Sequence, residues 1–287
     1  MNQKKEKVML ILSMCIFSTI GILRRYIPYS SGFVAMVRGF VGAVFLLCLL
    51  LLRGGKPDFN AIRKNGKVLL LSGAAIGLNW IFLFEAYRYT TVAIATLCYY
   101  LAPILVILAS PVVLKEKLTF QKSLCAFAAL FGIILVSGVG TNTLSGTKDM
   151  AGIGFGLAAA VLYASVMLLN RKIHDISCDD KTISQLFIAS AVLLPYVLLT
   201  DDFSSMEFTM LPVVLLLVAG VVHTGIAYWL YFGAIGNLNA QTTALYSYID
   251  PIGAILLSVV LLNEPLSLGA CIGAVLILGA AIYSERT

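Results

Sequence analysis

The sequence predicts an all-α integral membrane protein with ten transmembrane helices, and three observations support this fold class. First, 60% of the 287 residues are hydrophobic and 12% are charged, whereas soluble domains are about half apolar and about a quarter charged. Second, apolar runs that are long enough to cross a bilayer follow one another along the chain. Third, short motifs of the first half recur in the second. The composition excludes an ordinary soluble enzyme, a disordered chain and a nucleic-acid-binding domain.

The predicted spans, numbered 1 to 10 in chain order, are the ten apolar runs. They cover residues 8–26, 33–52, 67–89, 91–113, 119–138, 150–170, 182–200, 209–232, 240–262 and 267–283. Each is predicted to be a helix, because an open sheet edge is not stable in lipid. The start of the chain resembles a signal peptide, but no small-residue cleavage site follows it. Residues 8–26 are therefore interpreted as an uncleaved first span.

Lysine and arginine are distributed unequally over the two sides of these spans. The side that carries both termini holds 15 of the 20, the opposite side holds four, and Arg38 lies within a span. The positive-inside rule then places both termini in the cytoplasm, and we expect a multi-pass protein of the plasma membrane. The lipid bilayer is its expected surrounding and nucleic acid is not an expected partner. The pattern leaves monomer and homodimer open.

An internal repeat relates the two halves of the chain. Pro103 recurs as Pro251 and Glu116 recurs as Glu264, and both pairs are 148 residues apart. Each copy contains five spans, and this odd number makes the two copies enter the membrane in opposite directions. The sequence therefore predicts two inverted five-helix repeats, 1–140 and 150–287, which form one membrane domain. Inverted repeats are typical of secondary transporters, whose substrate binds near the midplane between the halves.

These motifs resemble one family. The pattern of Pro103, Glu116, Thr119 and Phe131-Gly132, with the same Pro–Glu spacing in the second half, resembles the drug/metabolite transporter superfamily and its EamA-like branch of ten-helix proteins. The resemblance covers nearly the whole chain and does not specify a substrate. It implies alternating access through a central cavity lined by spans 1–4 and 6–9, with spans 5 and 10 at the periphery. Members move amino acids, amines, nucleobase-like compounds and other small metabolites.

Asp250 is the first candidate for a substrate or coupling site, because ionisable groups within spans are costly and so are expected to be functional. It lies about halfway along span 9, beside Pro251, and it shares a polar stripe with Thr243, Tyr246 and Gly253. Its carboxylate is suited to bind a cationic substrate group or to exchange a proton. The alternative is a structural hydrogen bond between helices. The two acids that recur in the repeat, Glu116 and Glu264, are instead expected to be loop or cap residues with a role in the fold.

Three further ionisable residues have both a functional and a structural interpretation. Glu85 either binds an amine or a proton, or forms an intrahelical pair with Arg88 three residues later. Arg38 either binds a substrate carboxylate or Glu85, or snorkels or pairs with an acid near the outer interface. His223 either shuttles protons or is a hydrogen-bonded packing residue. Asp250, Glu85 and His223 are therefore the candidates for proton coupling.

Aromatic residues complete the predicted site. Many aromatic side chains are expected to be packing or interfacial residues, but several stand beside the two midplane prolines. Tyrosines near a carboxylate can hold an ammonium group by cation–π contact, and they can equally stack on an aromatic solute. The aromatic residues predicted to contact substrate are Trp80, Tyr99, Tyr100, Tyr246 and Tyr248.

The predicted function is secondary active transport of a small polar metabolite, such as an amino acid, amine or organic cation, with proton coupling left open. No phosphate-binding loop motif is present, so ATP hydrolysis is not expected, and neither a cofactor nor a metal is expected. The alternative is an exporter of neutral or aromatic metabolites or drugs by facilitated exchange. An integral-membrane enzyme is a remote alternative, because no catalytic constellation is present. Import and export are not distinguished.

Overall fold

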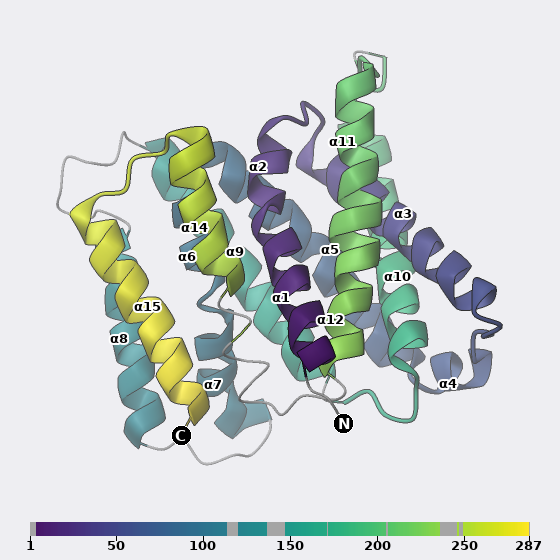
Figure 1. Ribbon diagram of the computed structural model, residues 1–287, viewed down its shortest axis with the longest axis horizontal. Coiled ribbons are helices and arrows are strands. Elements are labelled where there is room, and N and C mark those ends of the chain that lie inside the picture. The colour runs from purple at the N-terminus through teal and green to yellow at the C-terminus, as the bar shows by residue number, and fades with distance from the viewer. Residues whose placement is uncertain are drawn as a thin grey trace.

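The structure is a computed structural model that describes residues 4–113, 120–136, 147–170, 172–204, 206–235, 246 and 249–286. Within these residues the chain forms helices and connecting turns without a strand, which confirms the all-α prediction (Figure 1). Among the described residues, six helical segments are long and apolar enough to cross a membrane: Lys4–Arg25, Ser31–Leu52, Gly66–Tyr89, Lys148–Asn170, Cys178–Thr200 and Met210–Tyr231. Four shorter apolar helices are Val92–Val106, Ser123–Gly132, Ile249–Leu262 and Leu268–Ala280.

The helices follow the predicted spans in order. Those of the first half are α1 (Lys4–Ser18), α2 (Ile20–Arg25), α3 (Ser31–Leu52), α4 (Phe59–Lys64), α5 (Gly66–Tyr89), α6 (Val92–Tyr99), α7 (Ala102–Val113) and α8 (Phe120–Val136). Those of the second half are α9 (Thr147–Asn170), α10 (Cys178–Thr200), α11 (Met210–Gly220), the π-helix η1 (Val221–Ile226), α12 (Ala227–Ile235), α14 (Ile249–Leu262) and α15 (Leu268–Arg286).

The packing of the helices pairs elements of the two halves. Helix α5 lies along α9, α1 lies along α12 and α14, and α10 packs against both α3 and α5. Helices α8 and α15 form a separate pair at one side of the bundle (Figure 1). Glycines allow some of these close contacts, since a Cβ atom at Gly73 of α5 would lie 2.6 Å from Cγ2 of Ile188 on α10. Gly77, one turn later, allows the same close approach, since its Cβ atom would lie 3.1 Å from the carbonyl oxygen of Ala189.

Within the part of the chain that the structure describes, spans 1, 4 and 8 depart from regular α-helix geometry. Span 1 changes from α1 to α2 at Thr19, span 4 changes from α6 to α7 at Tyr100 and Leu101, and span 8 contains η1. The break in span 4 has a local cause, because Pro103 has no N–H to donate to the carbonyl four residues earlier. Breaks of this kind free backbone groups within the apolar interior, where polar side chains can bind them.

The two ends of the bundle are distinct. Helix α1 begins and α15 ends at the same end of the molecule, the termini end (Figure 1). The connection after α4 meets the connection before α10, where Nδ2 of Asn65 donates to the carbonyl of His174 over 2.9 Å. Lys64 and Asp175 form an exposed ion pair of 2.8 Å beside it. The opposite end, the far end, carries residues 26–31, 90–91, 200–204, 206–209 and 263–267.

Candidate functional site

Asp250 meets the break in span 4. The hydroxyl of Tyr100 donates a hydrogen bond to Oδ2 of Asp250 over 2.5 Å. Tyr100 caps the end of α6 and Asp250 lies in the first turn of α14, so this contact joins spans 4 and 9. Among the described residues, no cationic side chain lies within ion-pair distance of Asp250. The predicted acid is thus an interior, partly buried carboxyl group with a neutral partner.

Further tyrosines surround this pair. Tyr99 stacks on Tyr163 of α9, with ring centroids 5.1 Å apart and an interplanar angle of 19°. Tyr99 also meets Tyr100 edge-on at 5.9 Å. Tyr163 and Tyr228 lie within electrostatic range of the Asp250 carboxyl group. The structure therefore brings the predicted residues Tyr99, Tyr100 and Asp250 together, and it adds Tyr163 and Tyr228, which were not among the predicted site residues.

Arg38 is the second charge in the interior. It is 5% exposed, and its Nε donates to Oγ1 of Thr224 in η1 over 3.0 Å. Its guanidinium lies 4.3 Å from the centroid of the Trp80 ring and 5.4 Å from that of Phe84. Within the described residues it has no ion-pair partner, so neither a snorkelling position nor a pair with an acid describes it. Trp80, another predicted site residue, serves as its aromatic platform.

His223 is buried in η1 and both of its ring nitrogens have partners. Nε2 lies 2.8 Å from Oγ1 of Thr19, at the break in span 1, and Nδ1 lies 3.3 Å from the carbonyl oxygen of Val218. This is the hydrogen-bonded packing residue of the structural interpretation. The Thr19 hydroxyl also lies 2.8 Å from the carbonyl of Ile16. Because the single hydroxyl proton of Thr19 cannot be donated to both Ile16 and Nε2, the direction of the hydrogen bond between Thr19 and His223 depends on the tautomer and protonation state of the imidazole.

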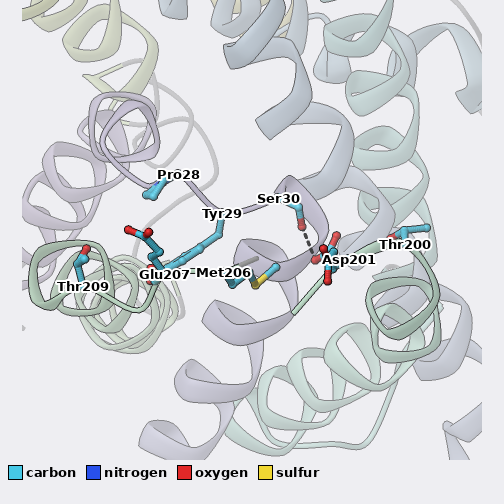
Figure 2. Close-up of a pocket in the computed structure, with 9 residues that line it drawn as sticks. Pro28, Tyr29, Ser30, Thr200, Asp201, Met206, Glu207 and Thr209 are labelled. Carbon is cyan, nitrogen blue, oxygen red and sulfur yellow. Dashed lines mark hydrogen bonds between the residues drawn. The ribbon is translucent and has the colours of Figure 1, made fainter. Parts of the chain in front are cut away.

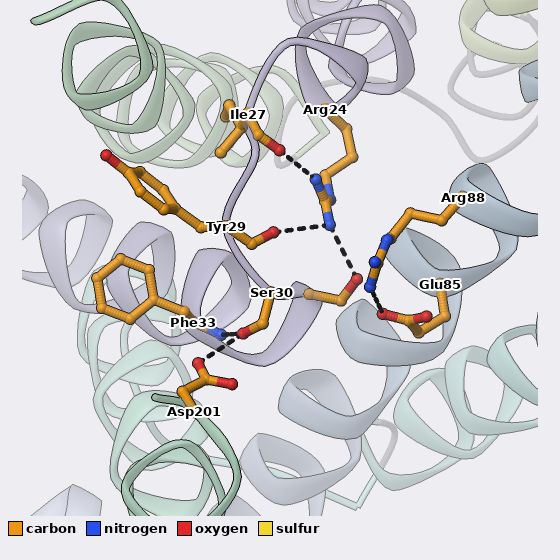
Figure 3. Close-up of polar contacts among 9 residues, drawn as sticks. Arg24, Ile27, Tyr29, Ser30, Phe33, Glu85, Arg88 and Asp201 are labelled. Atoms are coloured by element: carbon orange, nitrogen blue, oxygen red, sulfur yellow. Dashed lines mark hydrogen bonds and ion pairs between the residues drawn. The ribbon is translucent and has the colours of Figure 1, made fainter. Parts of the chain in front are cut away.

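Glu85 forms the predicted intrahelical pair. Its Oε1 lies 3.0 Å from Nη1 of Arg88, and the two side chains are 19% and 54% exposed. Figure 3 shows this pair at the far end, beside the connection between α2 and α3. Glu85 therefore has a counter-charge within the protein, whereas the described partner of Asp250 is neutral. The functional interpretation is weaker for Glu85 than for Asp250.

Arg24 is a buried charge that was not among the predicted site residues. It is 4% exposed and donates to the carbonyls of Ile27 and Tyr29 and to the hydroxyl of Ser31, over 2.7, 3.1 and 3.0 Å (Figure 3). These contacts shape the connection between α2 and α3. No sequence signal separates Arg24 from Arg25, because the two adjacent arginines differ only in the direction of their side chains, about 100° apart around the helix axis.

Glu264 has the cap role that was expected of it. Its Oε2 accepts a hydrogen bond of 2.8 Å from the backbone N–H of Val92, at the start of α6. Its Oε1 forms an ion pair of 2.9 Å with Arg25, which also donates to the carbonyl of Thr90 over 2.8 Å. The side chain of Glu264 is 10% exposed. These four residues, the Glu264 clasp, tie the connection between spans 9 and 10 to spans 1 and 4. Glu116 lies outside the described residues.

The remaining predicted tyrosines are less informative. Tyr246 is partly buried and packs against a small cluster formed by Leu10, Met14 and Ala234. It belongs to the contact between α1 and α12, and no described contact joins it to Asp250. Tyr248 lies outside the described residues.

An acidic pocket of about 430 Å³ opens at the far end. Figure 2 shows its walls, which come from the α2–α3 connection on one side and the α10–α11 connection on the other. Oδ2 of Asp201 accepts a hydrogen bond of 2.6 Å from Ser30, and the Tyr29 hydroxyl donates to the carbonyl of Glu207 over 3.3 Å. The pocket is lined by Pro28, Tyr29, Ser30, Thr200, Asp201, Asp202, Met206, Glu207 and Thr209.

Comparisons with known proteins match this chain to transporters. It is 28% identical over 279 residues to the uncharacterized transporter YxxF of Bacillus subtilis, covering 96% of this chain and 88% of that protein. It is 25% identical over 227 residues to the protein PecM of Dickeya dadantii, covering 76% of this chain and 73% of that protein. A solved crystal structure shares the fold with a TM-score of 0.67 at 17% identity, and covers 99% of this chain and 98% of that one.

A family model covers nearly the whole chain. The model of the EamA-like transporter family matches twice, at residues 5–138 and at residues 150–284. Both matches coincide with the segments that hold the paired proline and glutamate motifs. The resemblance drawn from those motifs is therefore confirmed, and the protein is a multi-span membrane protein that belongs to the EamA-like transporter family.

Proposed function

We propose that this protein is a secondary active transporter that carries a small polar metabolite with a cationic group through a central cavity by alternating access, coupled to protons. Amino acids, amines and organic cations are the candidate substrates. The protein lies in the plasma membrane with both termini in the cytoplasm. Asp250 is the binding and coupling residue of this proposal, and Tyr99, Tyr100, Trp80 and Arg38 line the same site.

The observation that carries the proposal is the pairing of Asp250 with Tyr100. A carboxyl group within a span is expensive, yet its described partner is a neutral hydroxyl and not a cation. An ammonium group or a proton would supply the missing positive charge. The stacked rings of Tyr99 and Tyr163 beside it offer faces for cation–π contact. Glu85 lacks this property because Arg88 already neutralises it.

The two-repeat architecture supports alternating access. The family model matches each half separately, and the contacts between halves come in corresponding pairs. Helix α5 of span 3 packs on α9 of span 6, as α12 of span 8 packs on α1 of span 1. Transporters built from inverted repeats expose a midplane site to either side by rocking one unit against the other.

The Glu264 clasp suits the closed side of such a cycle. It links the second half, through Glu264, with the first half, through Arg25 and the backbone of Val92. For a solute to leave through the far end, spans 1 and 4 have to separate from the connection between spans 9 and 10. We propose that the clasp breaks and re-forms once in each transport cycle.

One observation favours a second candidate function. The Tyr99–Tyr163 stack and the Trp80 ring present aromatic faces that bind neutral planar solutes as well as cations. The alternative is thus an exporter of neutral or aromatic metabolites or drugs by facilitated exchange. It differs from the main proposal in needing no titrating group, so a pH gradient would not drive it.

A thermal-shift screen of the purified protein, followed by flux into proteoliposomes, tests the proposal. The panel contains amino acids, amines, quaternary ammonium compounds and nucleobases. We expect stabilisation by compounds that carry a cationic nitrogen, and uptake of those compounds that follows an imposed pH gradient. Hits confined to anions would overturn the substrate class. Hits confined to neutral aromatic compounds, with uptake indifferent to pH, would establish the alternative.

The variant Asp250→Asn tests the coupling residue, because it keeps the shape and the hydrogen bond to Tyr100 but removes the titrating group. The expected result is flux that no longer responds to the pH gradient. The matched control is Glu85→Gln, which changes an acid that already has a counter-charge. Normal coupling in Asp250→Asn would transfer the role to another residue.

A further inference from the structure

Span 8 contains one residue more than span 3, its counterpart in the first half. Gly73 and Gly77 of span 3 are four residues apart, whereas Gly220 and Gly225 of span 8 are five apart. The pairs correspond in space under the proposed two-repeat organisation. A Cβ atom at Gly73 would lie 2.6 Å from a side-chain carbon of Ile188 on α10, and one at Gly220 would lie 2.6 Å from Cβ of Val41 on α3. These two partners come from spans 7 and 2, which are themselves counterparts.

The extra residue explains the π-helix. Span 3 is a continuous α-helix, α5, through this region, while span 8 holds the six π residues of η1 between its two glycines and just beyond them. A single inserted residue in a helix is commonly absorbed as a π turn, and such turns are frequent at functional sites. The insertion therefore makes the two halves unequal at one point in the bundle interior.

The π turn presents Thr224 to Arg38. The Thr224 hydroxyl donates to the carbonyl of Ala219, five residues earlier, over 2.9 Å, and this leaves its oxygen to accept from Nε of Arg38 over 3.0 Å. Gly42, one turn after Arg38 on α3, allows the approach, because a Cβ atom there would lie 2.5 Å from Cγ2 of Thr224. Trp80 fixes the guanidinium plane from the other side at 4.3 Å.

Among the described residues, the Arg38 guanidinium is hydrogen-bonded along one edge. Nε is the Arg38 atom that donates to an acceptor among the described residues, so no described group binds the terminal fork of Nη1 and Nη2. The residue is nevertheless 5% exposed, and a buried charge needs a partner to be tolerated. The planar fork of an arginine matches the two oxygens of a carboxylate. Tyr228 and Tyr99 lie within electrostatic range of Arg38 and also of Asp250.

We propose that Arg38 binds the carboxylate-like anionic group of the transported solute, and that Thr224, placed by the inserted residue of span 8, is its positioning residue. This inference rests on the proposed transport function and narrows it, because the solute then carries an anionic oxygen pair in addition to the cationic group that Asp250 binds. The aromatic platform of Trp80 and Phe84 beside the fork favours an apolar or aromatic portion next to that group.

Fluorescence of Trp80 tests this inference without knowledge of the natural substrate. The chain has two tryptophans, so Trp229→Phe leaves Trp80 as the reporter beside Arg38. The probes are benzoate and benzylamine, which share a ring and differ in charge. We expect benzoate to change Trp80 emission saturably in the purified full-length protein, and Arg38→Gln to abolish this response. A Trp80 response to benzoate that is absent, or is unchanged in Arg38→Gln, would overturn the carboxylate site.

Variants at Thr224 test the positioning role. Thr224→Val removes the acceptor of Nε while keeping the shape, and we expect its emission in the absence of probe to move toward that of Arg38→Gln, with benzoate affinity about tenfold weaker. Thr224→Ser keeps the hydroxyl and should restore both properties. Thr200→Val, which removes an exposed hydroxyl of α10, is the matched control. Wild-type emission and affinity in Thr224→Val would limit Thr224 to its hydrogen bond with the carbonyl of Ala219 within span 8.

Arg38→Lys keeps the test decisive if Thr224→Val does not fold. Lysine retains the charge but lacks the planar fork, so benzoate should still bind, with lower affinity than in the wild type. Equal affinity in Arg38→Lys would contradict recognition by the fork. These binding outcomes are separable from transport: a protein that binds benzoate through Arg38 but moves no solute in proteoliposomes would refute the proposed function and leave the anion site intact.

Discussion

The interior of the bundle and its far end hold their charged side chains in opposite ways. In the interior, Asp250 accepts a hydrogen bond from a tyrosine, and Arg38 rests on aromatic rings and a threonine hydroxyl. At the far end, Glu264 has Arg25 as a counter-charge, and a backbone N–H fills its second oxygen. Both regions contain buried or nearly buried carboxylates, so burial alone does not distinguish them.

This difference indicates which charged residues act in transport and which stabilise the fold. A charge that is paired within the protein already has its electrostatic needs met, and its contribution is to hold helices together. A charge with neutral partners in an apolar interior is poorly compensated. We infer that such a charge binds its partner during transport, either a solute or a proton. Changes in the interior should therefore affect solute binding and proton coupling, and changes at the far end should affect stability and the rate of the transport cycle.

The sharpest test of this comparison is Asp250→Asn, for which we expect the largest effect. Loss of a buried charge contact costs about 2–5 kcal/mol, so flux of a cationic solute should fall roughly 100-fold. The melting temperature of the ligand-free protein should stay the same or rise, because a poorly compensated charge is removed. Flux into proteoliposomes and thermal unfolding in detergent measure the two quantities. A variant with wild-type flux and a lower melting temperature would place Asp250 with the structural charges.

The opposite outcome is expected for Glu264→Ala. This change removes the ion pair to Arg25 and the acceptor for the N–H of Val92, and loss of a helix cap costs about 1–2 kcal/mol. The free energy of unfolding should fall by that amount, while the apparent affinity for solute stays near that of the wild type. Glu264→Gln retains an acceptor for Val92 and should lose less. If the alanine variant changed affinity and not stability, the clasp would belong to the binding site.

The sequence was sufficient for much of this fold and for part of the site. The spans follow from apolar run lengths, and the loop or cap role of Glu264 follows from the resemblance of its motif to the family. Asp250 could be chosen because it is an acid within a span. The contacts of Thr224 and Arg24 could not be predicted in this way. A threonine gives no signal in an apolar helix until the π turn rotates it toward Arg38, and Arg24 differs from Arg25 only in the direction in which its side chain points.

The hydroxyl of Tyr100 permits a finer test within the interior. Tyr100→Phe leaves the ring but removes the donor to Asp250, and a hydrogen bond to a charged group contributes about 1.5–3 kcal/mol. The solute recovers part of this loss, because it gains access to the Oδ2 atom of Asp250 that Tyr100 no longer occupies. We therefore expect the flux to fall by about fivefold. Proteoliposome uptake as a function of pH measures it. A shift of the pH profile would show that Tyr100 sets the protonation of Asp250, and a uniform loss would assign it to solute contact.

Glu85→Gln should have a smaller effect than any of these. An intrahelical pair at i and i+3 contributes about 0.2–0.5 kcal/mol, and Arg88 is more than half exposed. We expect a slight loss of stability, with flux and its response to the pH gradient unchanged. Thermal unfolding and pH-driven uptake of this variant test the expectation. Uptake that no longer responds to the gradient would instead support Glu85 as a coupling residue.

The smallest effect is expected at the termini end, for the exposed pair of Lys64 and Asp175. The hydrogen bond and charge of Lys64 lower the pKa of the Asp175 carboxyl group, and those of Asp175 raise the pKa of Lys64. The pair therefore stabilises the fold above the unfolded-state pKa of Asp175, and this contribution is lost as the pH falls through the folded value. It is lost again at alkaline pH as the raised pKa of Lys64 is passed.

Because both groups are exposed and screened by solvent, this contribution is small. The variant Lys64→Met should therefore have the melting temperature of the wild type at neutral pH and at acidic pH. A clear difference from wild type on acidification would mean that surface pairs contribute to stability as the Glu264 clasp does, and the contrast between buried and exposed ion pairs would fail.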